Sequence, residues 1–355
     1  MWSNRYMPLA LFWLCPACGD ALSSGGLDQA ELGINPAQAL NVAPPPGSLR
    51  IAFGSCYDND EPEPLWGQIT RAQPDAWLWL GDNIYADTTD PELIRSLYNE
   101  VLRDPGYERL SSNTLVLGTW DDHDYGANDA GKEFSAKEAS QKELLDFLGE
   151  PEDSPRREQA GVYAAQDLRW GDESVRVILL DTRYHRDAFG SDGTVLGQEQ
   201  WRWLEQQLDD SSAVVNIIAS SIQLIPEENP NEQWSRFPSD KQRLLELFAN
   251  TSARNLIVVS GDRHIAEISE LDLGPWTKDD AEPRTLYEIT SSSMSRPSKG
   301  PTFSEPNRYR VGELFSGINF GTLTLVKESS GDLVQFSVRD DLGFTRVDLE
   351  LALAE

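Results

Sequence analysis

Residues 76–85 read Ala-Trp-Leu-Trp-Leu-Gly-Asp-Asn-Ile-Tyr, an apolar run typical of a buried strand that ends in a glycine and polar side chains. Four more apolar runs end in the same way, and the polar residues that follow them include Cys56, Asp121–Asp124, Asp181–Arg183 and Asp262–His264. In layered α/β folds, the loops after the strand C-termini converge on one crevice, where ligands bind. Cys, Asp, Tyr, Asn and His side chains that meet there form the donor set of a metal site.

The chain alternates strand and helix patterns from Arg50 onward, and the pattern changes near residue 285. Helical spacing of apolar residues predicts helices over 93–102, 201–208 and 244–248. Beyond 285 the sequence predicts no further helices but short strands over 286–289, 321–326, 333–338 and 346–351. No internal repeat or second linker interrupts this order. We therefore predict an α/β fold, a two-sheet β-sandwich flanked by helices with a mostly β C-terminal part, as a single catalytic domain over 48–355.

The N-terminal segment has the pattern of an export signal. Arg5 precedes a short apolar stretch, and Cys18 is followed by a Gly/Ser-rich run. This arrangement predicts a bacterial lipoprotein signal over 1–18, with Cys18 lipidated, and a flexible tether over 19–47. Ordinary signal-peptidase cleavage is the alternative. We expect an exported protein at the periplasm or cell surface, which touches the membrane only through an anchor at Cys18.

The composition argues against one class of partner. The 355 residues carry 30 Lys and Arg against 59 Asp and Glu, a formal net charge of −29. Nucleic-acid backbones require a positively charged surface, so we expect no nucleic-acid partner, and an exonuclease-like activity is disfavoured. Hydrophobic residues make up 39% of the chain, enough for a packed core.

The first candidate ligands follow two predicted strands. A carboxylate at Asp82 can bridge two cations, and a phenolate at Tyr85 suits a hard cation such as ferric iron. Alternatively, Asp82 caps a turn and Tyr85 is a packed side chain. Cys56 is either a thiolate ligand or a small buried hydrophobe.

The second set of candidates follows two later strands. Four polar residues, Asp121–Asp124, are costly directly after an apolar strand unless they are paired, hydrated or bound to metal. Asp262 and His264 can face one cluster from a single strand end. Arg183 offers a planar fork suited to a phosphate, although a surface ion pair is the alternative.

Five motifs in order resemble those of the alkaline phosphatase D family, within the calcineurin-like metallophosphoesterase superfamily. They are residues 54–56, 81–85, 120–124, 180–184 and 261–264, and the resemblance extends over roughly 50–325. It implies a ferric ion held by Cys, Asp and Tyr beside calcium, with other divalent metals as alternatives. The implied metal ligands are Cys56, Asp82, Tyr85, Asp122, Asn128, Asp262 and His264.

The resemblance also implies a reaction. His123 would stabilise the phosphate or protonate the leaving group, and Arg183 would bind the phosphate. The expected activity is hydrolysis of small phosphate monoesters, diesters or both by a metal-bound hydroxide. The alternative is a non-catalytic, lipid-tethered metal-binding protein on the same fold.

Overall fold

The computed structural model describes residues 44–354 apart from 62–64, 190–191, 279–283 and 299–302. The predicted signal over 1–18 and most of the predicted tether over 19–47 lie outside the described residues. The described residues belong to one unit, Ala39–Glu355. Within the described part of the chain, no helix is both long enough and apolar enough to cross a membrane.

The first sheet has six strands in the order β13-β12-β11-β1-β2-β3. Its strands are β1 (Leu49–Gly54), β2 (Ala76–Leu80), β3 (Leu115–Thr119), β11 (Asn319–Val326), β12 (Leu333–Asp340) and β13 (Thr345–Ala352). β1, β2 and β3 are parallel, and the C-terminal strands add to β1 in antiparallel order. The carboxyl ends of β1, β2 and β3 therefore lie at one edge of this sheet.

The second sheet has seven strands in the order β10-β8-β9-β7-β6-β5-β4. Its strands are β4 (Ala164–Trp170), β5 (Glu173–Leu179), β6 (Val215–Ser220), β7 (Leu256–Ser260), β8 (Ala266–Asp272), β9 (Thr285–Ser291) and β10 (Arg310–Phe315). β5, β6 and β7 are parallel, so their carboxyl ends also share one edge.

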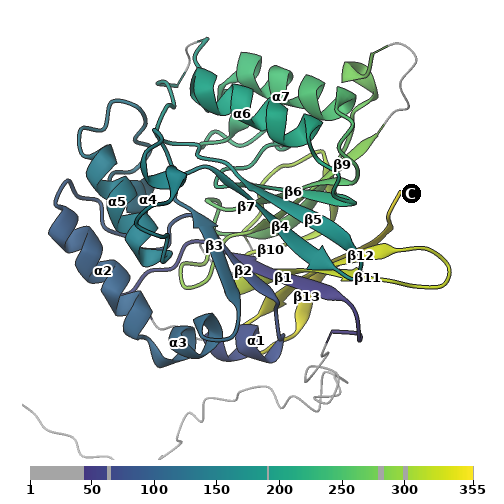
Figure 1. Ribbon diagram of the computed structural model, residues 1–355, viewed down its shortest axis with the longest axis horizontal. Coiled ribbons are helices and arrows are strands. Elements are labelled where there is room, and N and C mark those ends of the chain that lie inside the picture. The colour runs from purple at the N-terminus through teal and green to yellow at the C-terminus, as the bar shows by residue number, and fades with distance from the viewer. Residues whose placement is uncertain (1–43, 62–64, 190–191, 279–283, 299–302, 355) are drawn as a thin grey trace, which may run out of the picture. The chain divides into compact units, whose positions relative to one another are not determined.

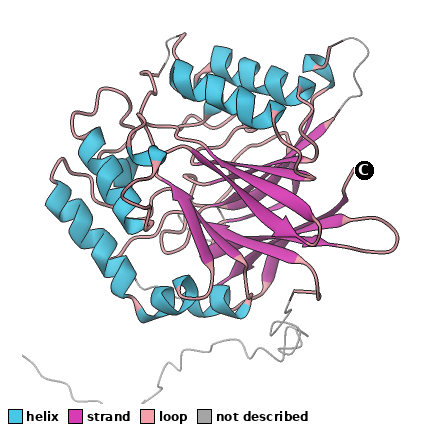
Figure 2. Cartoon of the chain, viewed as in Figure 1, coloured by secondary structure: helices cyan, strands magenta, loops and turns pink. Residues whose placement is uncertain are grey.

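Helices cover the outer face of each sheet (Figure 1), and Figure 2 shows the strands between the two helical groups. α1 (Trp66–Arg71), α2 (Pro91–Arg103), α3 (Pro105–Ser111), α4 (Asp122–Tyr125) and α5 (Lys137–Phe147) accompany the first sheet, and α6 (Gly197–Asp209) and α7 (Pro238–Asn250) cover the second. Aliphatic side chains from both sheets pack between them in one core, which includes Ile51, Leu78, Val177, Ile217 and Val259. Burial of such apolar surface is the main force that holds the two layers together.

Local sequence accounts for where the helices begin. Asp90 accepts a hydrogen bond from the Glu92 amide at the start of α2, and Pro91 occupies the first helical turn. Asp104 does the same for α3, where Pro105 follows it. Both helices therefore begin at an Asp-Pro pair, a helix-capping pattern that is visible in the sequence.

The predicted fold class is confirmed: two sheets are flanked by helices, and the described residues beyond 285 form strands. The predicted C-terminal strands correspond to β9, β11, β12 and β13, and the three predicted helices to α2, α6 and α7. β8 and β10 were not predicted. A buried position in a strand is expected to be apolar, whereas Glu267 of β8 is buried in an ion pair with Arg310 of β10. These charged residues interrupt the apolar pattern by which a strand is predicted.

Candidate metal centre

The predicted ligands converge at the carboxyl ends of the parallel strands. Cys56 follows β1, Asp82 follows β2, Asp122 follows β3 and His264 follows β7. These strands belong to two different sheets, so the centre spans both sheets at the edge where their parallel strands end. Its ligands come from positions about 200 residues apart in the chain.

The Asp82 carboxylate is the hub of this cluster. Its Oδ2 lies 3.4 Å from Cys56 Sγ and 3.2 Å from the Tyr85 hydroxyl, and its Oδ1 accepts a hydrogen bond of 3.3 Å from the His123 amide. The same Tyr85 hydroxyl lies 3.1 Å from His264 Nε2. The structure therefore joins Cys56, Asp82, Tyr85 and His264 in one chain of contacts.

Among the described residues, three groups of donor atoms are each compact enough to hold a cation, with all ligand atoms in a group within 4.8 Å of one another. The groups are Cys56–Asp82–His264, Asp82–Asp122–His123 and Asp122–Asp129–Glu232. Because Asp82 and Asp122 are each shared, the three groups form one chain of adjoining sites. Glu232 and Asp129 were not among the predicted ligands.

Asn128 lies beside this cluster in the loop after α4, where it is exposed. Its neighbour Asp129 belongs to the third donor group, and the Asp129 amide donates a 2.7 Å hydrogen bond to Asp122 Oδ2. A ligand role for Asn128 stays a prediction. Glu232 was not predicted as a ligand because it lies in an irregular segment, twelve residues beyond the end of β6, where no strand pattern marks it.

Orphaned carboxylate oxygens show that the cluster fits a cation. Among the described residues, Oδ1 of Asp122 and Oδ2 of Asp262 are buried and have no hydrogen-bond partner. The Asp262 oxygen lies 3.7 Å from Arg263 Nη1, too far for a hydrogen bond. A buried carboxylate oxygen without a hydrogen-bond partner is costly, whereas one that binds a metal is not. A donor set of thiol, phenol, imidazole and carboxylates is one that can hold metal ions, and the identity of the metals stays a prediction.

Backbone strain is concentrated in the same place. Eight described non-glycine residues have positive φ, and six of them are Cys56, Asp82, Asp87, Asp129, Asp262 and His264. Each such conformation is uncommon for a residue with a Cβ. Strain that gathers at one site is typical of side chains positioned for function, because the surrounding fold must hold them there.

The side chains of the cluster do not favour their own charged forms. Burial, followed by repulsion from Cys56 and Asp122, raises the pKa of Asp82 well above its usual range. Burial likewise raises the pKa of the Cys56 thiol to about 11, and that of Tyr85 well above its usual value. Burial, then the positive charges of Arg296 and Arg263, lowers the pKa of His264 to about 4. Cations would reverse this balance for the anionic ligands.

His123 lies at the rim of the centre. Its Nδ1 is 2.8 Å from Asp87 Oδ1, and its ring packs against Tyr85 with centroids 4.3 Å apart. The His123 side chain is 18% exposed, so it reaches solvent next to the buried ligands. Sequence reasoning identified His123 but not Asp87, which lies in a loop with no strand pattern to mark it.

Arg183 is fully buried beside the candidate metal ligands. Its guanidinium contacts the carboxylates of Asp121 and Glu232, the latter at 2.6 Å. Glu232 also receives Arg186 Nε at 3.1 Å. Phosphate binding by Arg183 stays a prediction, because in this arrangement the guanidinium contacts carboxylates of the protein. The alternative for Arg183 was a surface ion pair with Asp181 or Asp187. The structure instead shows buried ion pairs with Asp121 and Glu232.

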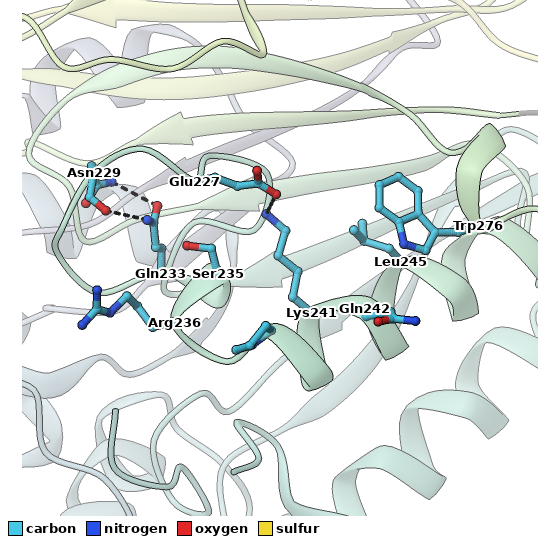
Figure 3. Close-up of a pocket in the computed structure, with 10 residues that line it drawn as sticks. Glu227, Asn229, Gln233, Ser235, Arg236, Lys241, Gln242, Leu245 and Trp276 are labelled. Carbon is cyan, nitrogen blue, oxygen red and sulfur yellow. Dashed lines mark hydrogen bonds and ion pairs between the residues drawn. The ribbon is translucent and has the colours of Figure 1, made fainter. Parts of the chain in front are cut away.

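A separate pocket of about 480 Å³ is lined in part by Asn229 and Gln233, from the segment that carries Glu232. Figure 3 shows Lys241 and Glu227 directed toward each other in it, with Nζ 3.1 Å from Oε1, and Trp276 at one end. Asn229 and Gln233 hydrogen-bond to one another on its wall. The candidate metal ligands do not line this pocket.

Comparison with solved structures gives the same architecture. A structure of PhoD aligns with a TM-score of 0.69 and 18% identity over 88% of this chain and 69% of that chain. Purple acid phosphatase PPD1 from yellow lupin (Lupinus luteus) seeds aligns at 0.62 and 14% identity, over 87% and 55%. GAP50, described as the anchor in the inner membrane complex of Plasmodium, aligns at 0.57 and 13% identity, over 87% and 90%.

Sequence comparison is more specific. Alkaline phosphatase D of Bacillus subtilis (strain 168) is 28% identical over a segment that covers 26% of this chain and a fifth of that protein. The PhoD-like phosphatase family model matches residues 51–322, a span that runs from β1 into β11 and encloses every candidate ligand. With a match over most of its length, and with the donor cluster inside that match, the chain belongs to the PhoD-like phosphatase family.

Proposed function

We propose that this protein hydrolyses small phosphate monoesters, diesters or both, with ferric iron and calcium as its cofactors. The observation that carries the proposal is the set of contacts at the strand ends, where Asp82 contacts Cys56 and Tyr85 and the Tyr85 hydroxyl contacts His264. Membership of the PhoD-like phosphatase family supports the phosphoester class.

The donor chemistry supports two kinds of cation. Cys56, Asp82, Tyr85 and His264 combine a thiol, a phenol and an imidazole with a carboxylate, a set that suits iron. The oxygen-rich ligands on the other side of Asp82 suit calcium, which prefers carboxylates and carbonyls. Those residues are Asp122, Asp129, Glu232 and Asp262, with Asn128 retained from the sequence prediction. Bound cations of this kind polarise phosphoryl oxygens and acidify a coordinated water.

His123 has the geometry of a proton donor for the leaving alcohol. Its Nδ1 contact with Asp87 fixes the ring, so Nε2 is the nitrogen that would transfer the proton. Partial exposure at the rim lets the ring meet a substrate that enters from solvent.

Elemental analysis of the purified protein, combined with monoester and diester assays, tests this proposal. We expect iron and calcium in the wild type, a visible absorption band from a ferric–phenolate pair, and turnover of a nitrophenyl phosphate ester. Asp82→Asn should lose metal and at least about 100-fold in activity, beyond the ~10–100-fold typical of outer-shell changes. A colourless, iron-free and fully active protein would exclude iron as the cofactor. An Asp82→Asn variant with full activity would show that Asp82 is not an essential metal ligand.

A non-catalytic metal-binding protein is the second candidate. It is favoured by the similarity to GAP50, which shares the fold and is described as an anchor. Fold alone does not determine function. This candidate predicts full metal content with no turnover of any phosphoester in the same assays.

We also propose that the protein is exported and anchored through a lipid on Cys18. The support is the signal pattern in the sequence. Labelling of the full chain with a radioactive fatty acid in bacterial cells should succeed for the wild type and fail for Cys18→Ala. Equal labelling of both would reject the anchor.

A further inference from the structure

A short segment after β9 lies against the metal centre. The Ser295 amide donates a 3.2 Å hydrogen bond to the Cys56 carbonyl, and the Ser298 amide donates one of 3.0 Å to the His264 carbonyl. The segment is thus tied to the backbones of two candidate ligands that come from different sheets. Arg296 lies between these two tethers, so its Cα is held beside the centre.

The Arg296 side chain extends over the candidate ligand Tyr85. Its guanidinium carbon is 4.2 Å from the centroid of the Tyr85 ring, and its Nε lies 3.0 Å from Asp58 Oδ2. The side chain is 40% exposed. A guanidinium has five N–H donors in a rigid fork. The Asp58 contact uses Nε, which leaves the Nη donors for a ligand that enters from solvent.

Two other arginines near the centre are less accessible. Arg183 is fully buried between Asp121 and Glu232. The Arg263 side chain is only 11% exposed, and Nε and Nη2 of its guanidinium both contact Glu305. Arg296 is therefore the best placed of these three cations to meet an anion at the solvent side of the ligands.

We propose that Arg296 binds the non-bridging phosphoryl oxygens of the substrate and makes the site prefer a dianionic monoester to a monoanionic diester. This inference rests on the proposed function and adds the residue that recognises substrate charge. Arginine matches phosphate geometry with two parallel N–H donors, and such charge-assisted bonds are among the strongest hydrogen bonds. The surrounding carboxylates would otherwise repel the more highly charged substrate.

The test measures binding of inorganic phosphate to the metal-loaded protein by calorimetry, so it does not depend on turnover. Arg296→Ala should weaken phosphate binding about 10- to 100-fold, the range for loss of one charged hydrogen-bond partner. Arg296→Lys should keep part of the affinity, because it keeps the charge but not the fork. Iron and calcium contents should equal those of the wild type.

Two variants separate direct binding from loss of a packed ion pair. Lys327 matches Arg296 in environment, since it lies over the Trp170 ring, pairs with Glu173 and is 42% exposed, but it follows the far end of β11. Lys327→Ala should bind phosphate like the wild type. Asp58→Asn removes the partner of Arg296 but keeps the arginine, so phosphate affinity should stay equal or increase.

The outcomes are distinct. Arg296→Ala that binds phosphate within about twofold of the wild type, or that loses metal, overturns the proposal. Asp58→Asn that weakens binding as much as Arg296→Ala also overturns it, because the pair would then act structurally. For an active wild type, Arg296→Ala should lower kcat/KM for monoesters more than for diesters. A wild type that binds phosphate through Arg296 but hydrolyses no ester would reject the proposed function and keep this inference.

Discussion

The hydroxyl of Tyr85 lies 3.1 Å from Nε2 of His264, a residue 179 positions later in the chain. Tyr85 follows β2 of the first sheet and His264 follows β7 of the second, so this contact joins the two layers of the sandwich. A cation bound by both residues would act as a cross-link between sheets. Metal binding should then contribute to the stability of the whole fold, because ligand binding to the folded state adds to its free energy of unfolding.

Removal of metal should lower the thermal and urea stability of the wild type. With free metal at about 100 to 1,000 times Kd, binding adds about 3–4 kcal/mol to the free energy of unfolding. The measurement is urea unfolding before and after dialysis against a strong chelator. Asp82→Asn is the control, and it should show little response to the chelator. Equal stability of the wild type with and without metal would contradict the cross-link.

The metal-free protein should become less stable as the pH rises. Burial raises the pKa of Asp124 to about 8, and the pKa values of Asp82 and Asp262 also lie well above 3.8, the ordinary value. The folded state therefore holds protons that the unfolded state releases. The stability from these groups is fully present below about pH 4 and is lost as the pH rises through the folded-state pKa values.

Unfolding of the chelated protein at several pH values between 4 and 8 checks this sign. Each titrating carboxyl contributes a slope of up to about 1.4 kcal/mol per pH unit. The metal-loaded protein should show a weaker dependence, since bound cations replace the protons. A metal-free protein that gains stability from pH 5 to 8 would show that these carboxyls are not the dominant groups.

Glu232→Gln should destabilise the protein strongly. Glu232 lies buried between Arg183 and Arg186, and removal of its charge leaves both guanidinium groups without a full counter-charge. Breaking a buried ion pair in this way costs about 3–5 kcal/mol. The matched control is Glu205→Gln, which removes one partner of the exposed Arg243–Glu205 pair and should cost less than about 1 kcal/mol. Equal effects in urea unfolding would contradict the structural role of Glu232.

His123→Gln should slow hydrolysis of esters with poor leaving groups most. An alkoxide needs a proton as it departs, whereas a nitrophenolate is stable without one. We expect a loss of about 100-fold or more in kcat for an alkyl phosphate and a smaller loss for a nitrophenyl phosphate, consistent with general acid catalysis. Asp87→Asn should reproduce part of this difference, because Asp87 orients the His123 ring. The same loss for both esters would argue against proton donation.

The sequence predicted the fold because local signals agree with the global arrangement. Apolar runs such as 76–80 and 256–260 form the buried parallel strands β2 and β7, and the residues just after them reach the same edge. A residue that follows a buried strand directly, such as Asp82, has its position fixed by the strand. That is why the hub of the candidate centre was visible in the sequence.

The rest of the site depends on tertiary packing that no local pattern encodes. Glu232 and Arg296 lie in irregular segments. The Arg296 segment is held at the centre by backbone hydrogen bonds to Cys56 and His264, which are far away in the chain. The Arg183 motif was recognisable, but its burial was not. Whether a guanidinium faces solvent or Glu232 is decided by the path of residues 221–233, far away in the chain.

Gly81→Ala should damage both stability and the metal centre. Gly81 has φ +97°, and an added Cβ would lie 2.5 Å from Asp121 Cβ and 2.7 Å from the Asp121 nitrogen, so the backbone between Leu80 and Asp82 would have to move. Strain of about 1–2 kcal/mol and overpacking of about 1–3 kcal/mol add to a loss of about 2–5 kcal/mol.

Gly149→Ala isolates the strain component of this prediction. Gly149 has φ +68°, but an added Cβ there would meet no heavy atom within 4 Å. That variant should lose only the strain of about 1–2 kcal/mol and keep its full metal content. Urea unfolding and elemental analysis of both variants make the comparison. Suppose that Gly81→Ala kept the metal content of the wild type and lost no more stability than Gly149→Ala. The close packing of Gly81 against Asp121 would then not be needed to position Asp82, because Asp82 would still bind metal after its backbone had moved.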